Sequence, residues 1–112
     1  MKLFSKTDVG KRREINEDYI YTSDKPVGNL PNLFIVADGM GGHNAGDYAS
    51  KHAVDKAVSV IERYTDEYDA ENILQKAIDD ANTHINKISR QDRKYKGMGT
   101  TFVAVTFEGS HV

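Results

Sequence analysis

Two long amphipathic stretches, each next to an apolar stretch, constrain the fold of this chain more than any other feature. Apolar residues recur every three or four positions over 49–64 and again over 73–88, the spacing of a buried helix face. The run at 33–38 is continuously apolar, as in a strand covered on both faces, and the run at 100–107 is rich in β-branched and aromatic residues. The pattern predicts two helices that pack side by side on a sheet.

Short polar residues mark the expected ends of these elements. Asn44, with Asp47 three residues later, resembles a capping pair for the first helix, and Asp69 is the expected cap of the second. Both prolines fall within 22–32, which reads as the connection between the strand at 33–38 and an earlier strand at 18–22.

The residues after the last apolar run predict an exposed strand edge. Glu108, Gly109 and Ser110 resemble a hairpin turn, and no further strand follows them. The strand at 100–107 would then lack one neighbour, which natural domains usually avoid. We therefore expect an incomplete domain in which self-association through an open sheet edge is feasible.

Composition limits the classes of protein that remain. The 112 residues allow one domain, and 15 basic against 17 acidic residues give a formal charge of −2. That balance gives no sign of a general nucleic-acid or anionic-membrane surface. Cysteine is absent, which excludes thiolate metal sites, and neither a signal peptide nor a membrane span is apparent. A cytoplasmic location is the expectation.

The loop after the first apolar run places one carboxylate before a series of glycines. The sequence VADGMGGHNAG, residues 36–46, contains Asp38 and four glycines. A dinucleotide-binding loop does not fit, because Asn44 stands where its third glycine belongs, and no Lys-Ser or Lys-Thr pair completes a P-loop. Because Asp38 would repel a phosphate directly, a hard divalent cation between them is the natural interpretation.

A second cluster of charges lies upstream, at 12–18. It combines two arginines with three acidic residues, a mixture suited to holding metal and phosphate together: Arg12, Arg13, Glu14, Glu17 and Asp18. A solvated charged turn remains an equal alternative when either motif is considered alone.

Three motifs together resemble a known family. In order along the chain they are DVGKRREINED (8–18), VADGMGGHNAG (36–46) and GMGTT (97–101). They resemble the amino-terminal half of a bacterial PPM-type, or type-2C, metal-dependent serine/threonine protein phosphatase, and the resemblance spans essentially all 112 residues. It implies an α+β fold, a β-sandwich flanked by antiparallel helix pairs, of which residues 1–112 would be the amino-terminal part of a single domain.

The resemblance also implies roles for particular residues. The family uses two Mn²⁺ or Mg²⁺ ions to activate a water against a phosphate monoester. Asp38 would bridge the two ions, the carbonyl of Gly39 would bind one of them, and Glu17 would act through a metal-bound water. Asp18 would be a supporting acid, and Arg13 would clamp the phosphate oxygens by bidentate hydrogen bonds.

Two departures from the family pattern stand out. Met40 follows the Asp-Gly pair where eukaryotic relatives carry a histidine, so the proton donor is unassigned; His43 is nearby, but a structural role suits it equally. The carboxylate motifs of the family's carboxyl-terminal half do not occur in these residues. We therefore expect weak Mn²⁺ binding and little or no phosphatase activity from the chain alone.

Three functional hypotheses remain open at this point. The first is a cytoplasmic phosphatase that acts on phosphoprotein substrates and is paired with a serine/threonine kinase and its targets. The second is a non-catalytic phosphatase-like domain that binds phosphoproteins or a kinase, and the third is a fragment with no independent role. The basic run at 90–96 fits attraction of a phosphoprotein, but it also fits a solvated helix end. His52, His84 and His111 are expected to be surface or packing residues.

Overall fold

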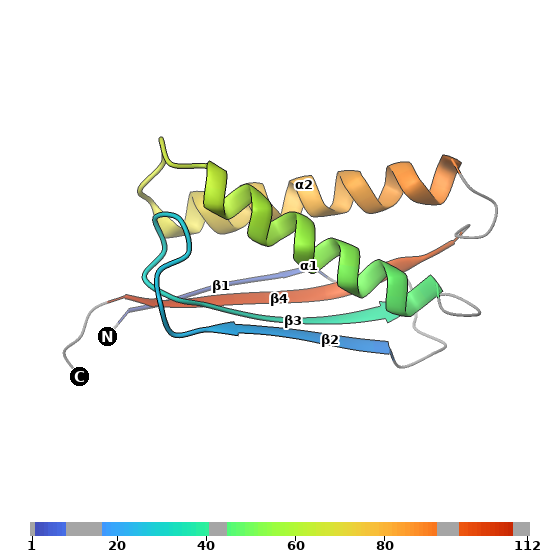
Figure 1. Ribbon diagram of the computed structural model, residues 1–112, viewed down its shortest axis with the longest axis horizontal. Coiled ribbons are helices and arrows are strands. Elements are labelled where there is room, and N and C mark those ends of the chain that lie inside the picture. Colours follow the sequence, from blue (N-terminus) through green and yellow to red (C-terminus); the bar gives the residue numbers. More distant parts are fainter. Residues whose placement is uncertain (1, 9–16, 41–44, 92–96, 109–112) are drawn as a thin grey trace.

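The computed structural model describes residues 2–8, 17–40, 45–91 and 97–108. Within them the four strands form one antiparallel sheet in the order β1-β4-β3-β2, with the two helices following β3 in the chain (Figure 1). The elements are β1 (Lys2–Asp8), β2 (Glu17–Ser23), β3 (Leu33–Met40), α1 (Ala45–Arg63), α2 (Ala70–Gln91) and β4 (Gly99–Glu108).

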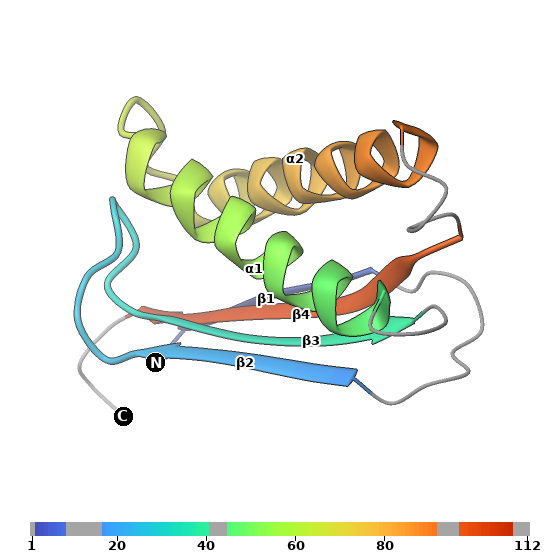
Figure 2. The same cartoon turned by 45° about the vertical axis from the view of Figure 1, so that its right-hand side comes forward.

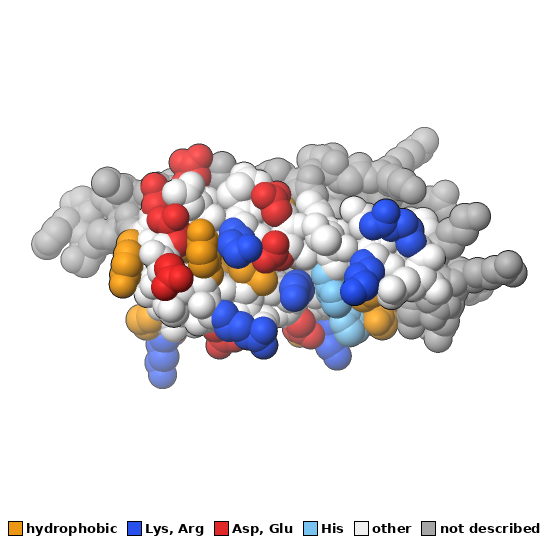
Figure 3. Space-filling view, turned by 90° about the horizontal axis from the view of Figure 1, so that it is seen from above, with side chains coloured by type: hydrophobic (Ala, Val, Ile, Leu, Met, Phe, Trp, Pro, Cys, Tyr) orange, Lys and Arg blue, Asp and Glu red, His pale blue; other side chains and the backbone are white. Residues whose placement is uncertain are grey.

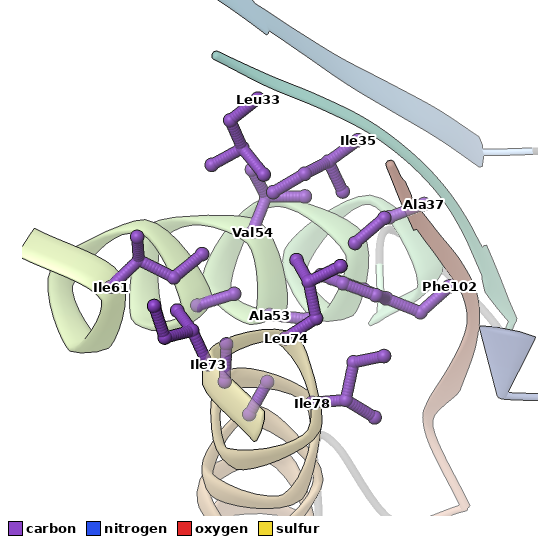
Figure 4. Packing of buried hydrophobic residues seen from close by; sticks show 14 of the residues in the cluster. Leu33, Ile35, Ala37, Ala53, Val54, Ile61, Ile73, Leu74, Ile78 and Phe102 are labelled. Atoms are coloured by element: carbon purple, nitrogen blue, oxygen red, sulfur yellow. The ribbon is translucent and has the colours of Figure 1, made fainter. Parts of the chain in front are cut away.

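The two helices form a second layer on one face of the sheet. They run in opposite directions, side by side, as the views in Figures 1 and 2 both show. Between the layers, Leu33 and Ile35 of β3 pack toward Val54 of α1 and Leu74 of α2, and all four side chains are almost fully buried (Figure 4). Burial of these apolar side chains is the main stabilising contribution to the fold. The predicted helix pair on a sheet is confirmed.

The helix boundaries agree with the capping residues read from the sequence. The Asp69 carboxylate accepts hydrogen bonds from the backbone N–H groups of Glu71 at 2.9 Å and Asn72 at 3.5 Å, which satisfies donors that the first turn of α2 leaves unpaired. Asp47 lies in the first turn of α1, where its negative charge interacts favourably with the positive end of the helix dipole. Asn44, the other predicted capping residue, lies outside the described residues.

The prediction that the strand at 100–107 lacks a neighbour is wrong. β4 is a central strand, paired with β3 on one side and with β1 on the other, where Lys2 lies opposite Glu108 and Asp8 opposite Phe102. The missing neighbour is therefore supplied by the first residues of the chain, which carry no strong strand pattern. Among the described strands, β1 and β2 form the two edges of the sheet. Gly109 and Ser110, part of the predicted turn, lie outside the described residues.

The expectation that the strand at 33–38 is covered on both faces also fails within the described residues. The helices cover one face only, and on the opposite face Ile20, Val36 and Val103 are 64%, 48% and 37% exposed. These three residues lie in one row across β2, β3 and β4. A continuous apolar run therefore supplies the core on one side and an exposed apolar row on the other.

The loop between β2 and β3 holds the end of α1 in place. Gly28 has a φ of +56°, and a Cβ at this position would overlap the backbone carbonyl of Ile61. Next to it, the side-chain amide of Asn29 donates hydrogen bonds to the carbonyls of Thr65 at 3.0 Å and Glu67 at 2.8 Å. These contacts satisfy carbonyl groups just after the helix, where no intrahelical donor is left.

Candidate functional site

Strand register brings four of the five predicted site residues together at one end of the sheet. Asp18 of β2 lies directly opposite Asp38 of β3, and Glu17 lies directly opposite Gly39. Asp38 is two residues along β3 from the exposed Val36, so by strand alternation its position belongs to the face of the sheet that the helices leave uncovered. Gly39 belongs to the other face. Arg13, the fifth predicted residue, lies outside the described residues.

Asp38 is half-buried, and its Oδ1 atom is inaccessible to solvent. On the β4 side of β3, Thr101 lies directly opposite Asp38. The hydroxyl of Thr101 donates a 3.4 Å hydrogen bond to the backbone carbonyl of Asp38. The neighbouring Thr100 is buried, and its hydroxyl donates to the carbonyl of Thr101 at 2.8 Å. The carboxylate of Asp38 is therefore held on a hydrogen-bonded central strand.

The donor set at this end of the sheet fits a hard divalent cation. Carboxylate-bearing residues at directly opposed positions of an antiparallel pair repel each other unless a positive charge compensates them. Asp18 and Asp38 occupy such positions, and the backbone carbonyl of Gly39 is one residue further along β3. Carboxylate and carbonyl oxygens are the ligands that Mg²⁺ and Mn²⁺ prefer. Among the side chains that the structure describes, no cluster of three or more His, Cys, Asp or Glu is placed to hold a metal.

Gly39 has a packing role that the sequence did not reveal. A Cβ at Gly39 would overlap the backbone carbonyl of Gly46 in the first turn of α1, so strand and helix approach each other here without side chains between them. Gly46 is itself buried. Of the four glycines of the 36–46 motif, Gly39 therefore allows the end of β3 to lie against the start of α1 at Gly46. The other two, at 41 and 42, lie outside the described residues, as does His43.

Two of the remaining histidines belong to the helix layer. The ring of His52 stacks on Tyr48 with centroids 3.9 Å apart, and the ring of His84 lies 6.5 Å from that of His52. Burial, followed by the positive charges of Lys56, His52 and Lys87, lowers the pKa of His84 below its usual value. His52 and His84 are half-buried and contact other rings of the helix layer, which agrees with the prediction of surface or packing residues. His111 lies outside the described residues.

The position of Thr101 beside Asp38 depends on strand register. From the sequence, the GMGTT motif offers Thr100 or Thr101 as a residue near the phosphate, but a glycine-flanked turn into a strand without a function is the favoured interpretation. In the structure Thr101 shares a row with Asp38 and Asp18. Only the register of β4 against β3 reveals this, because residues 38 and 101 are far apart in the chain.

Comparison with known proteins identifies the class. The family model described as "Protein phosphatase 2C" matches residues 10–112, and the chain belongs to this family. It is 41% identical over 110 residues to the serine/threonine phosphatase stp of Listeria monocytogenes, covering 96% of this chain and 43% of that protein.

Solved structures agree with this family membership. The S. agalactiae serine/threonine phosphatase matches with a TM-score of 0.64 and 37% identity, over 96% of this chain and 44% of that one. The catalytic domain of the phosphatase PstP, solved in complex with two manganese ions, matches with a TM-score of 0.65 and 29% identity, over 96% and 44%. The fold of this chain is therefore that of PPM phosphatases.

The chain spans less than half the length of the curated relatives it matches, 42% and 43% of the first two. Within the described residues, neither helix has the length and apolar character needed to cross a membrane.

Proposed function

We propose that this chain carries part of the active site of a metal-dependent serine/threonine protein phosphatase. The observation that carries the proposal is the register of β2 against β3, which sets Asp18 opposite Asp38 and Glu17 opposite Gly39. An acidic, oxygen-rich strand end of this kind suits divalent cations. Family membership and the two manganese ions in the PstP structure support the same chemistry.

Each site residue has a proposed role. Asp38 would contribute its carboxylate to the two-ion site, and Gly39 would contribute its backbone carbonyl. Asp18 would add a second carboxylate from the facing strand, and Glu17 would hold a water by hydrogen bonding. Arg13 would bind the phosphate oxygens of the substrate through its planar guanidinium group. Two bound Mn²⁺ or Mg²⁺ ions would activate the attacking water and neutralise charge on the phosphate.

The extent and setting of this site are part of the proposal. Residues 1–112 would form the amino-terminal part of a single domain, which the greater length of the relatives supports. Further carboxylates of the family pattern do not occur in the sequence, so the chain holds a partial site. Phosphoproteins are the proposed substrates, since the relatives are named serine/threonine phosphatases. The proposed partners are a serine/threonine kinase that phosphorylates the same targets and a second copy of the chain, bound through a sheet edge. The proposed location is the cytoplasm.

Metal binding tests the proposal independently of turnover. Titration of the purified chain with Mn²⁺, followed by the electron paramagnetic resonance signal of the free ion, should reveal weak binding. Replacing a direct ligand should weaken that binding by about tenfold or more, so Asp38→Asn is the test variant. Asp24→Asn, which removes an exposed carboxylate in the β2–β3 loop, is the matched control and should bind like the wild type. Equal binding by the Asp38 variant and the wild type would refute the proposed site.

Turnover tests whether the partial site is sufficient. We expect little or no Mn²⁺-dependent hydrolysis of para-nitrophenyl phosphate or of a phosphothreonine peptide by the isolated chain. Robust hydrolysis that disappears in Asp38→Asn would contradict the expectation of a partial site while supporting the assignment of Asp38. Metal binding without turnover is the result expected of a partial site. It leaves the family assignment intact and is equally compatible with the alternative, a non-catalytic phosphatase-like domain that binds phosphoproteins.

A further inference from the structure

A basic groove lies on the outer surface of the helix pair, away from the sheet. It has a volume of about 270 Å³ and is lined by residues from one face of α1 and one face of α2. The α1 residues are Lys56, Ser59, Val60, Arg63 and Tyr64; the α2 residues are Lys76 and Asp80. Figure 3 looks onto this helix layer, where Lys and Arg side chains lie among scattered Asp and Glu.

The side chains that line the groove carry a net positive charge. Three cationic side chains and one carboxylate line it, so its net charge is 3 − 1 = +2. The carboxylate of Asp80 is engaged by Lys76, with 3.2 Å between Oδ2 and Nζ. Within the part of the chain that the structure describes, neither Lys56 nor Arg63 makes an ion pair. Like charges gathered in one groove repel each other, and a bound anion would relieve that repulsion.

The arrangement of the groove is suited to a phosphoryl group attached to a side chain. The ammonium group of Lys76 lies 5.6 Å from the centroid of the Tyr64 ring, and together with its bond to Asp80 this contact limits its motion. Arg63 supplies a forked donor for paired oxygens, and Ser59 supplies a hydroxyl. Half-buried Val60 and Tyr64 offer apolar contact for the carbon atoms next to the phosphate.

The electrostatic surroundings agree with this interpretation. Burial, and then the charge of Lys56 together with those of His52 and Lys87, lowers the pKa of His84 in the neighbouring part of α2. A phosphorylated residue carries close to two negative charges at neutral pH, which makes it the complementary group.

We propose that this groove docks a phosphorylated segment of a protein partner, at a site separate from Asp38. Lys56 follows the first residue of α1 by eleven positions, about 16 Å of helix. The lining residues of the groove belong to α1 and α2, which cover the other face of the sheet from the one left uncovered (Figure 1). The choice of a phosphoprotein over another phosphorylated ligand rests on the proposed function. Docking here would retain a multiply phosphorylated partner while a different phosphate is presented to the Asp38 end of the sheet.

Binding of a short phosphopeptide in the absence of divalent metal tests the inference. The probe is a fluorescein-labelled peptide of neutral residues with one phosphothreonine, measured by anisotropy in EDTA so that a metal site cannot contribute. The test variant is Lys56→Gln/Arg63→Gln, which should weaken binding by about tenfold or more. The matched control, Lys25→Gln/Lys87→Gln, removes two exposed lysines outside the groove and should change binding by less than about twofold.

Three outcomes would overturn the inference. They are equal weakening in both double variants, equal binding of the unphosphorylated peptide, and displacement of the peptide by inorganic phosphate at a concentration similar to that of the peptide. Amide NMR shifts at Ser59 and Tyr64 that saturate with the peptide would support it. Because the assay contains no metal and measures no turnover, its result is independent of whether the phosphatase proposal holds.

Discussion

At the scale of single residues, Gly39 ties the candidate site to the packing of the fold. Its missing side chain allows the end of β3 to contact the backbone of Gly46 in α1, and the preceding residue is Asp38. A change at this glycine therefore acts on the geometry of the site as well as on stability.

Gly39→Ala should destabilise the chain by about 1–3 kcal/mol, because the new methyl group must displace backbone atoms rather than a flexible side chain. Urea denaturation followed by circular dichroism measures the change. Gly97→Ala is the control. Gly97 has a φ of +80° but open space around it, so this substitution should destabilise the chain only through backbone strain, by about 1 kcal/mol. A smaller loss at Gly39 than at Gly97 would contradict the close approach of β3 and α1.

His84 should make stability depend on pH. Because burial and the charges of Lys56, His52 and Lys87 lower its pKa in the folded state, the unfolded chain binds this proton more readily. The contribution of neutral His84 to the free energy of unfolding is fully present above pH 6.5, the usual pKa of histidine. It is lost as the pH falls from there through the lower pKa of His84 in the folded state. The midpoint of urea denaturation should therefore decrease between pH 7.5 and pH 5, and less steeply in His84→Gln. The same slope in both proteins would refute this role.

The site illustrates what single residues can and cannot reveal in a sequence. The carboxylate of Asp38 and the glycines after it indicate a hard cation from their chemistry alone. Which acid faces Asp38 depends on strand register, and residue chemistry does not encode that register. The individual roles came from the family resemblance, and they remain proposals that the metal titration tests.

At the scale of elements, the two helices were the most predictable part of the fold. Their apolar spacing and the capping residue Asp69 are local signals, and both helices occur where these signals place them. β1 was not predicted, because Lys2–Asp8 mixes polar and apolar residues and its partner strand begins at Gly99. Contacts between such distant segments leave no local pattern that would identify them.

Asp69→Ala should destabilise α2, and with it the chain, by about 1 kcal/mol. The substitution removes the acceptor for the amide groups of Glu71 and Asn72. Asp66→Ala is the matched control, since it removes an exposed carboxylate from the turn between the helices, outside either helix. Thermal denaturation of the two variants gives the comparison, and an equal shift for both would show that charge rather than capping is responsible.

At the scale of the whole molecule, the two faces of the sheet differ in what they carry. The helix-covered face holds the hydrophobic core, and the opposite face presents the row Ile20, Val36 and Val103 beside the row that contains Asp38. Exposed apolar surface of this kind is typical of a contact surface. Anything that covers this row also comes close to the candidate metal site, so association and metal binding are expected to influence each other.

The central position of β4 also sets an order of events during synthesis. The last described strand inserts between β1 and β3, so the first strand has no partner within the sheet until residues 99–108 have been made. The helical hairpin and the β2–β3 pair can form earlier, because their contacts are more local. A growing chain therefore keeps β1 unpaired within this sheet while residues 9–98 are translated. Formation of β4 then joins β1 to the rest of the sheet.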